Sequence, residues 1–308
     1  MSIEYAIIVK NKTRLESLIE RFNTKAQAKF YIESFGGNFD DYESEHEIFQ
    51  MSLISLQTQL SSVIKNKTVE RIYLPSFLFS EKNLIIVIGQ DGLVANTAKY
   101  AKGCPIIAVN PDKNRYDGVL LPFDTSDFIL GVENVLDDKV QSKTMRFAEA
   151  MLNDGQRLLA FNDLFIGASS HISARYKISF NQNMEEHSSS GLIVSTSAGS
   201  TGWLSSVFNM AYGVTNMFEK DLIPKRPELK DNELLFVVRE PFKSIRTQTG
   251  INAGVISNQN SLTIESLMPS GGVIFSDGIE TDFLKFNSGS IAKIGIAPET
   301  AKIVVKSP

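Results

Sequence analysis

The chain has 308 residues, of which 43% are hydrophobic and 21% are charged, so it is long enough for two domains and has the composition of an ordinary globular protein. Its 31 basic and 35 acidic residues give a formal net charge of −4 and a pI near 5.6, which excludes the strongly basic class of nucleic-acid binders. No run approaches the roughly 18 apolar residues of a membrane span, and the first residues lack the pattern of a signal peptide, so we expect no membrane association.

The first third of the chain alternates between strand and helix patterns. Residues 3–9 form a short apolar run that predicts a strand. From 12 to 35, apolar residues recur at three- and four-residue spacing, which predicts one amphipathic helix ending at Gly36-Gly37. A second helix is expected at about 45–64 and another strand at 71–74.

Residues 84–88 are five consecutive branched apolar residues. A half-exposed strand would alternate, so this run predicts a central strand of a parallel sheet, buried on both faces. A turn at 89–92, a helix ending at Gly103 and a strand at 105–109 complete a β-turn-α-β unit. Cys104 is the only cysteine, which excludes an intramolecular disulfide. We expect a buried, unreactive Cys104 in a cytoplasmic protein.

Beyond about residue 125 the pattern changes. We expect a helical passage near 137–152, followed by short alternating segments that predict strands at 174–180, 192–195, 234–238, 262–267, 273–275 and 291–296. Several short strands at close spacing favour a β-sandwich over a second parallel sheet. The sequence therefore predicts an N-terminal Rossmann-like α/β domain over 1–125 and a β-rich, sandwich-like domain over 126–284.

Gly89-Gln90-Asp91-Gly92 lies between the predicted central strand and the next helix. Glycines allow the backbone to approach phosphate oxygens, and a helix N-terminus offers N–H groups and partial positive charge. Asp91 would lie at the carboxyl end of the strand, where open α/β sheets bind ligands, and it could accept a proton from a substrate hydroxyl. The alternative is a tight turn in which Asp91 only caps the helix.

Asn162-Asp163 follows the apolar segment 158–161. An amide beside a carboxylate offers both donors and acceptors, which suits recognition of a base edge or of ribose hydroxyls. The alternative is an Asx turn at the end of a strand.

The segment from Thr196 to Trp203 is the most unusual in the chain. Small residues, including Gly199, Ser200 and Thr201, follow an apolar strand, and the chain's only tryptophan follows them. Small side chains allow close approach of a ligand, hydroxyls donate hydrogen bonds, and an aromatic ring can line a pocket. We expect a helix to begin here with its N-terminus toward a ligand. The alternative is a buried Trp203 beside a serine-rich loop.

Other polar residues give weaker signals. The three histidines share no metal-ligand spacing, so no protein zinc site is predicted. Arg239-Glu240 is interpreted as an ion pair at the end of a strand. Asp277-Gly278 is interpreted as a turn or a second ligand contact.

In this order, the motifs resemble those of the NAD kinase family, which shares a fold with diacylglycerol and sphingosine kinases. The family's Gly-Gly-Asp-Gly is similar to Gly89–Gly92, its Asn-Glu pair to Asn162-Asp163, and its Gly-Ser-Thr-Ala-Tyr to Gly199–Trp203. The segments 108–112, 165–167, 189–192 and 238–241 are similar to the mitochondrial-type branch and its bacterial relatives.

The resemblance implies transfer of the ATP γ-phosphoryl group to the 2′-hydroxyl of NAD. It implies that Asp91 is the general base, that Mg²⁺ travels with the nucleotide, and that no protein metal site is needed. It implies a homodimer or higher homo-oligomer, and a C-terminal segment, at about 285–308, that returns to the first domain. The remaining implied contacts are with ATP through Gly89, Gln90, Gly92, Gly199 and Ser200, and with NAD through Asn162, Asp163, Thr201 and Trp203.

The chain departs from the family pattern at a few positions. Gln90 replaces a glycine, Leu93 replaces a threonine, and Asp163 is one methylene shorter than glutamate. Because a glutamine disfavours positive φ, Gln90 is expected to take an ordinary backbone conformation with its side chain turned away from the loop or toward a phosphate. A lipid kinase on the same fold and a catalytically inactive nucleotide-binding regulator remain alternatives.

Overall fold

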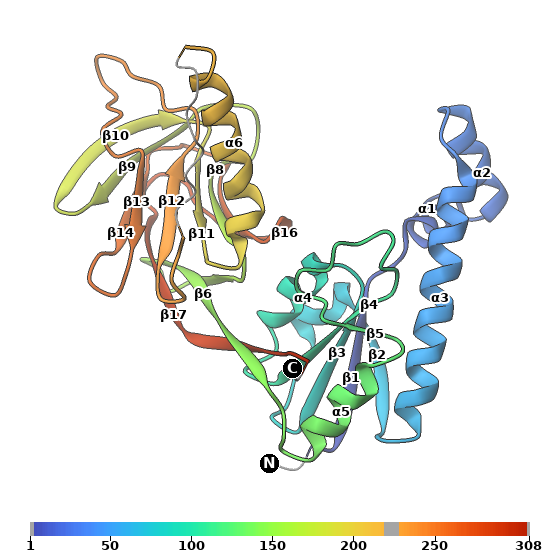
Figure 1. Cartoon of the computed structure of the whole chain (residues 1–308). Coiled ribbons are helices and arrows are strands. Elements are labelled where there is room, and N and C mark those ends of the chain that lie inside the picture. Colours follow the sequence, from blue (N-terminus) through green and yellow to red (C-terminus); the bar gives the residue numbers. More distant parts are fainter. Residues whose placement is uncertain (1–2, 219–227, 307–308) are drawn as a thin grey trace. The chain divides into compact units, whose positions relative to one another are not determined.

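The computed structural model describes residues 3–218 and 228–306, and the chain divides into two units (Figure 1). The first unit comprises Met1–Thr144 and Ala301–Pro308, and the second comprises Met145–Thr300. Two strands run from one unit into the other, β6 (Ser142–Leu152) and β17 (Ile291–Val304). Among the described residues, no helix is both long and apolar enough to cross a bilayer.

The first unit is built on a parallel sheet with strand order β17-β4-β3-β1-β2, and the short β5 pairs with β4. Its strands are β1 (Tyr5–Lys10), β2 (Asn66–Glu70), β3 (Asn83–Ile88), β4 (Pro105–Asn110) and β5 (Phe123–Asp124). Every side chain from Leu84 to Ile88 in β3 is buried. This confirms the prediction of a parallel-sheet strand covered on both faces.

Three helices cover the sheet. They are α3 (Phe39–Ser61), α4 (Asp91–Ala98) and α5 (Phe128–Leu136). Apolar residues of α3 and α5 pack with Ile86 of β3 and Ile107 of β4 in one core. Because side chains alternate along a strand, Ile85 and Val87 point to the opposite face, and α4 follows β3 directly.

The expected helix at 12–35 is two helices, α1 (Arg14–Phe22) and α2 (Lys25–Ser34). Asn23 takes a left-handed conformation with φ of 65°, which ends α1. The Thr24 hydroxyl then accepts a hydrogen bond from the Gln27 N–H at 3.1 Å and starts α2. The apolar spacing continues through the break, so periodicity alone gave one helix where there are two.

Three further element predictions were wrong in type or extent. Helix α3 starts earlier than residue 45, because Asn38 caps it. The segment predicted as a strand at 71–74 is a 3₁₀ helix, η1 (Arg71–Ser76), with Pro75 inside it. The expected helix at 137–152 is mostly β6, in which Met145 and Phe147 are buried and Arg146 is exposed, so sheet packing overrides local helix propensity.

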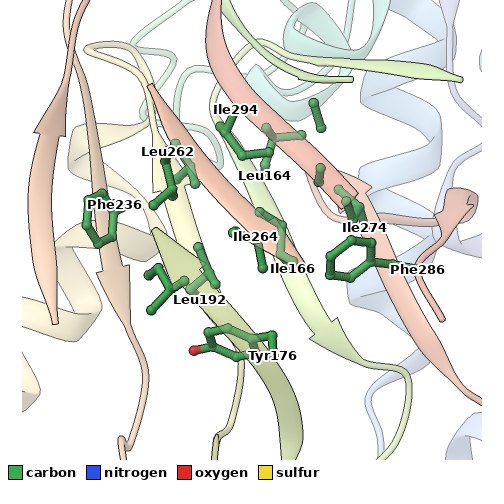
Figure 2. Close-up of a cluster of buried hydrophobic side chains, with 14 of the residues drawn as sticks. Leu164, Ile166, Tyr176, Leu192, Phe236, Leu262, Ile264, Ile274, Phe286 and Ile294 are labelled. Carbon is green, nitrogen blue, oxygen red and sulfur yellow. The ribbon is translucent and has the colours of Figure 1, made fainter. Parts of the chain in front are cut away.

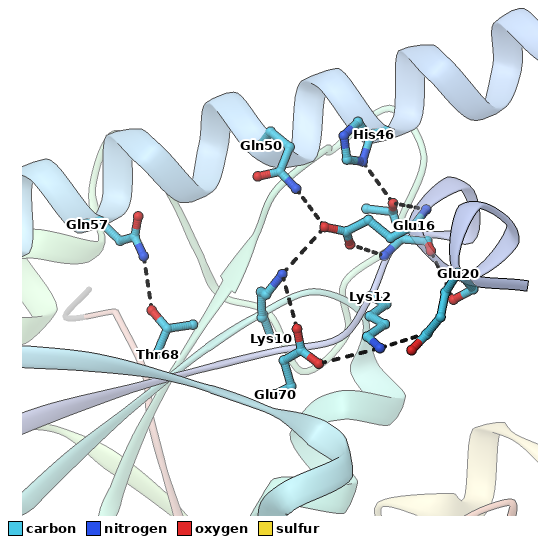
Figure 3. Close-up of polar contacts among 11 residues, drawn as sticks. Lys10, Lys12, Glu16, Glu20, His46, Gln50, Gln57, Thr68 and Glu70 are labelled. Carbon is cyan, nitrogen blue, oxygen red and sulfur yellow. Dashed lines mark hydrogen bonds and ion pairs between the residues drawn. The ribbon is translucent and has the colours of Figure 1, made fainter. Parts of the chain in front are cut away.

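Polar contacts join α1 to the sheet and to α3 (Figure 3). Lys10 at the end of β1 forms ion pairs with Glu16 of α1 at 3.6 Å and with Glu70 of β2 at 3.8 Å. Gln50 of α3 donates to Glu16 at 3.0 Å. The Glu16 carboxylate therefore connects the carboxyl end of β1 to α1 and α3, and Lys10 links this network to Glu70 of β2.

The second unit is a sandwich of two antiparallel sheets. One contains β10-β9-β14-β17 with β6 and β7, and the other has the order β13-β12-β11-β8-β15-β16. Their inner faces meet in one core, which includes Leu164, Tyr176, Phe236, Ile264 and Phe286 (Figure 2). The strands are β7 (Arg157–Ala160), β8 (Asp163–Ala168), β9 (Ala174–Phe180), β10 (Asn183–Ser189), β11 (Leu192–Ser195), β12 (Leu234–Val238), β13 (Ala253–Ile256), β14 (Leu262–Ser266), β15 (Gly272–Ser276) and β16 (Ile279–Lys285). The predicted combination of an α/β domain and a β-sandwich is confirmed.

The boundaries differ from the predicted ones. Helix α5 lies beyond residue 125, yet its Phe128 and Val132 pack with Ile107, so it belongs to the first unit. The returning segment begins at Ala301 rather than near residue 285, because β17 pairs with β4 only through Lys302 and Ile303.

Candidate functional site

The first group of candidate residues lies between β3 and α4. Gly89 has φ of 156°, and a Cβ there would lie 3.0 Å from the Leu93 side chain, so both the conformation and the space favour glycine. Gly92 is exposed, and no atom would lie within 4 Å of a Cβ at that position. The backbone of this loop is therefore accessible beside the N-terminus of a helix, where anions bind favourably.

Asp91 is the first residue of α4 and is half-buried. Its Oδ1 accepts a hydrogen bond from the Leu120 N–H at 2.7 Å. The N-cap position belongs to Gln90, so the alternative in which Asp91 caps the helix is wrong. The bond from Leu120 fixes the orientation of a carboxylate at the carboxyl end of the central strand.

Asn110 shapes the loop that contains Leu120. Its Nδ2 donates to the Tyr116 carbonyl at 3.0 Å, and its Oδ1 accepts from the Asp112 N–H at 2.9 Å. A Cβ at Gly118 would lie 2.8 Å from the same Nδ2, and Gly118 has φ of 67°. In the sequence, Asn110 belongs only to the family-like segment 108–112, and no local pattern connects it to Asp91.

Gln90 takes an ordinary extended conformation, with φ of −101° and ψ of 164°. It is exposed, and its side chain does not cap α4. The expected ordinary backbone is thus confirmed, and the loop holds its shape with a glutamine at this position.

The second group of residues is organised by Asp277. Its Oδ1 accepts from the N–H groups of Asn162 at 2.7 Å and Asp163 at 3.3 Å, and its Oδ2 accepts from Phe161 N–H at 3.1 Å. Asp277 and Gly278 have φ of 53° and 69° and form the turn between β15 and β16. The interpretation of Asp277-Gly278 as a turn is therefore correct. The Asp277 carboxylate holds the backbone at the start of β8.

Asp163 begins β8 and is only 9% exposed. Burial, and then the nearby charge of Asp277, raise the pKa of its carboxyl to about 7. Near neutral pH this group is therefore present in both protonation states, so it can donate as well as accept a hydrogen bond.

The loop after β11 packs directly on Asn162. The Thr196 N–H donates to the Asn162 carbonyl at 2.9 Å, and the Thr196 hydroxyl donates to the Phe161 carbonyl at 2.6 Å. A Cβ at Gly199 would lie 2.2 Å from the Asn162 carbonyl oxygen, so only glycine fits. The structure thus brings together two motifs that are separated by more than thirty residues in the sequence.

Ser200 and Thr201 follow in the short 3₁₀ helix η2 (Gly199–Thr201). The Ser200 hydroxyl donates to the Ser197 carbonyl at 2.8 Å, so it is partly used within the loop. Thr201 is exposed. Its hydroxyl is thus accessible to solvent on the second unit.

Trp203 opens helix α6 (Trp203–Thr215). Its ring stacks on Phe165 of β8, with centroids 5.6 Å apart and an interplanar angle of 12°. The Arg239 guanidinium lies 5.4 Å from the Trp203 ring centroid and 3.7 Å from the Glu240 carboxylate. One face of the indole is therefore covered by the protein itself, and Arg239 takes part in a cation–π contact as well as in the expected ion pair.

Histidine and cysteine do not contribute a metal centre in the part of the chain that the structure describes, where no three metal-ligating side chains cluster. His46 bonds to Thr13, and the buried His187 bonds to Glu185. Cys104 is 3% exposed, and burial raises the pKa of its thiol, as expected of an unreactive buried residue.

The fold as a whole is similar to two solved structures. Over 100% of this chain and 85% of the other, it matches the crystal structure of yeast NADH kinase complexed with NADH, with a TM-score of 0.60 and 14% identity. Over 97% of this chain and 92% of the other, it matches an NAD kinase from Archaeoglobus fulgidus in complex with ATP, with a TM-score of 0.55 and 15% identity. No family model and no curated protein matches the sequence. Likeness at this identity shows a shared fold, and that fold is the one of these two kinases.

Proposed function

We propose that this protein is a phosphotransferase of the NAD kinase type, which transfers the γ-phosphoryl group of ATP to the 2′-hydroxyl of NAD and forms NADP. The observation that carries the proposal is Asp91, a carboxylate oriented by the Leu120 N–H in an accessible glycine loop at the carboxyl end of the central strand. The two solved kinases with the same fold support this assignment.

In the proposed reaction, the 2′-oxygen of NAD attacks the γ-phosphorus of ATP. Asp91 accepts the proton that this 2′-hydroxyl loses. The bond between the γ-phosphorus and the bridging oxygen breaks, and ADP leaves. Such transfers depend on positioning and charge neutralisation. Mg²⁺, supplied with ATP, would neutralise part of the negative charge on the phosphates.

We assign phosphate contacts to backbone N–H groups and small residues, because these allow the closest approach to anionic oxygens. We assign acceptor contacts to side chains with donors, acceptors or an aromatic ring. The donor set is Gly89, Gln90, Gly92, Gly199 and Ser200, and the acceptor set is Asn162, Asp163, Thr201 and Trp203. The packing of Gly199 on Asn162 supports a single site for both sets, because it places a donor-set residue beside an acceptor-set residue.

The test is incubation of the purified protein with NAD, ATP and Mg²⁺ while NADP is followed with an NADP-specific dehydrogenase. NADP is expected only when the donor and a divalent cation are both present. NADH and polyphosphate replace NAD and ATP in parallel reactions, which define the acceptor and the donor.

Two other results would overturn the proposal. Tight NAD binding without turnover under any donor would leave a nucleotide-binding regulator, the function for which the replacement of glycine by Gln90 is the main argument. Phosphorylation of diacylglycerol or sphingosine instead of NAD would assign a lipid kinase.

We also propose that the protein assembles as a homodimer or a higher homo-oligomer. Helix α6 exposes Met210 and Val214, which are 50% and 54% accessible, and Met217, just beyond the end of the helix, is 78% accessible. An apolar stripe of this kind favours a protein partner. Light scattering after gel filtration should give at least twice the mass of one chain.

A further inference from the structure

The Asp91 carboxylate is held by a loop that lies outside its own helix. Within the described part of the chain, its side chain accepts one hydrogen bond, from the Leu120 N–H at 2.7 Å. Leu120 belongs to the loop 111–122, which joins β4 to β5. The last torsion of an aspartate has a broad range, so the direction of its two oxygens depends on such a partner. The orientation of Asp91 therefore depends on the position of this loop.

The loop has little regular structure of its own. Residues 111–122 form neither a helix nor a strand, so no ladder of backbone hydrogen bonds fixes Leu120. Its second half, residues 116–121, contains one backbone bond within itself, from the Leu121 N–H to the Gly118 carbonyl at 3.1 Å. The position of Leu120 therefore depends on side chains that bind the loop from outside.

The side chain that binds both halves of the loop is Asn110. It is the last residue of β4 and is only 5% exposed, so the sheet fixes its position. Its amide nitrogen holds the Tyr116 carbonyl, and its amide oxygen holds the Asp112 N–H. Because these bonds use both ends of the amide, they also fix its rotation. One buried amide thus connects the central sheet to the backbone near Leu120.

Gly118 shows how closely the second half of the loop wraps this amide. A Cβ at Gly118 would lie 2.8 Å from the Asn110 amide nitrogen and 3.3 Å from the Leu121 Cβ. Its φ of 67° is also one that residues with a Cβ rarely take. Leu121 is itself only 5% exposed. A side chain at position 118 would therefore displace either the amide or the buried end of the loop.

The first half of the loop has anchors that do not involve Asn110. The Ser52 hydroxyl of α3 donates to the Pro111 carbonyl at 3.0 Å. The Arg115 guanidinium lies 3.9 Å from the Glu45 carboxylate of the same helix. Loss of the Asn110 side chain should therefore release mainly the second half, which contains Leu120.

We propose that Asn110 is a positioning residue for Asp91. It holds the segment 116–121 through the Tyr116 carbonyl, and this segment orients the Asp91 carboxylate through the Leu120 N–H. This role rests on the proposed function, in which Asp91 accepts the proton of the 2′-hydroxyl. Asn110 is buried, so the role requires no contact with either nucleotide. Displacement of a reacting group by about 1 Å can cost roughly 100-fold in rate, which makes the orientation of Asp91 a measurable quantity.

A purely structural role of Asn110 gives different kinetics. It would lower the amount of folded protein and leave the kcat of each folded molecule unchanged. It would also cost the same whether or not the Asp91 carboxylate is present. A positioning role lowers kcat itself, and only where there is a carboxylate to position.

The first experiment is steady-state kinetics of NADP formation by the full-length protein. Asn110→Ala should lower kcat by about 10- to 100-fold, with the KM values for NAD and ATP changed by no more than about twofold. Gly118→Ala should give a similar loss by displacing the same amide. Circular dichroism selects a temperature at which every variant is folded. An unchanged kcat in either folded variant would contradict the proposal.

Asn114→Ala is the matched control. Asn114 is an exposed asparagine of the same loop, and its backbone N–H, not its side chain, bonds to the Asp112 carboxylate at 3.0 Å. The variant keeps this bond and should retain the kcat of the unmodified protein. A loss as large as that of Asn110→Ala would show that any change in the loop lowers the rate, and the specific role of Asn110 would be lost.

A double-mutant cycle tests whether Asn110 acts through Asp91. In the Asp91→Asn background, Asn110→Ala should lower the remaining kcat by less than about twofold, because the group that it orients no longer accepts a proton. The same fold loss in both backgrounds would mean that Asn110 acts by another route.

Hydrogen exchange measured by mass spectrometry gives a readout that needs no activity. In Asn110→Ala the amides of 116–121 should exchange faster, and those of helix α3 should not change. Equal exchange of 116–121 in both proteins would overturn the proposal. An unmodified protein that forms no NADP would overturn the kinase proposal and this role together, whereas an active Asn110→Ala with unchanged kcat would overturn this role alone.

Discussion

At the scale of single residues, the most direct test concerns Asp91. Asp91→Asn should lower the rate of NADP formation by roughly 10²–10⁴, because the amide cannot accept the proton of the acceptor hydroxyl. The fold should persist, since the amide oxygen can still accept the Leu120 N–H. Initial rates and circular dichroism measure both effects. Asp117→Asn, at an exposed position in the neighbouring loop, is the control, and a variant of Asp91 with more than half of the activity would remove it from the mechanism.

Asp163 should make stability depend on pH. Its pKa is about 7 in the folded protein and near 3.8 when unfolded, so between these values the folded state keeps a proton that the unfolded chain has released. Stability therefore falls as the pH rises from about 4 to 7, by at most about 4 kcal/mol. Asp163→Asn should lose this dependence, whereas Asp137→Asn at an exposed position should retain it. The melting temperatures of the unmodified protein and of both variants are measured at pH 5 and pH 8. The same change in melting temperature between the two pH values in all three proteins would contradict the prediction.

Gln90 is the third residue with a measurable consequence. Its backbone already has ordinary φ and ψ values, so the loop does not need the wider conformational freedom of a glycine at this position. Gln90→Gly therefore removes only a side chain. The affinity for ATP should change by about 1 kcal/mol, the net contribution of one hydrogen bond. Titration of ATP with each protein measures this. A hundredfold gain in affinity or rate would mean instead that glutamine obstructs the loop.

At the scale of elements, the packing of one loop on another can be tested with two glycines. Gly199→Ala places a Cβ 2.2 Å from the Asn162 carbonyl oxygen and should destabilise the protein by about 1–3 kcal/mol. Gly213→Ala in α6 meets no atom within 4 Å and should be neutral or stabilising, because alanine favours a helix. Urea midpoints compare the two variants. Equal urea midpoints would show that the loops of Gly199 and Asn162 can move apart without loss of stability.

The same scale shows what the sequence can and cannot predict. The run 84–88 predicted a doubly covered strand correctly, because burial on both faces leaves no alternation. The strand β6 was missed, because Met145 and Phe147 alternate within residues that also favour a helix. No local pattern places Asp277 on the N–H groups that precede β8, or Leu120 on Asp91, because these contacts join loops far apart in the chain.

The sequence partly predicted a cavity of the second unit, which is lined by residues that include Phe165, Trp203, Phe275 and Phe283. An aromatic residue after a run of small residues predicted a ligand pocket, and Trp203 does line a cavity. The other walls were not foreseeable, because Phe275 and Phe283 become neighbours of Phe165 only through the strand register. A glycine at 167 or 191 gives no sign, in the sequence alone, of the ring that lies over it.

At the scale of the whole molecule, the fold shared with the two solved kinases covers 100% and 97% of this chain, at 14% and 15% identity. The residues that set the fold are therefore mostly replaceable apolar ones. Cores tolerate such exchange when volume and pattern are kept. Positions at which another backbone segment packs directly on the chain tolerate fewer residue types. Gly199 and Gly272 are examples, because a Cβ there would lie 2.2 Å and 1.8 Å from a carbonyl oxygen.

The passage of the chain through β6 and back through β17 has a consequence for synthesis on the ribosome. The first unit's sheet receives its β17 strand only after the entire second unit has been translated. Until then the edge of β4 at Pro105 and Ile106 has no partner strand, and the site of Val304 in the core stays unfilled. A stop codon at position 301 should therefore yield mainly aggregated protein, although it removes few residues. Solubility after expression measures this, and a soluble, active product would show that the first unit closes without its last strand.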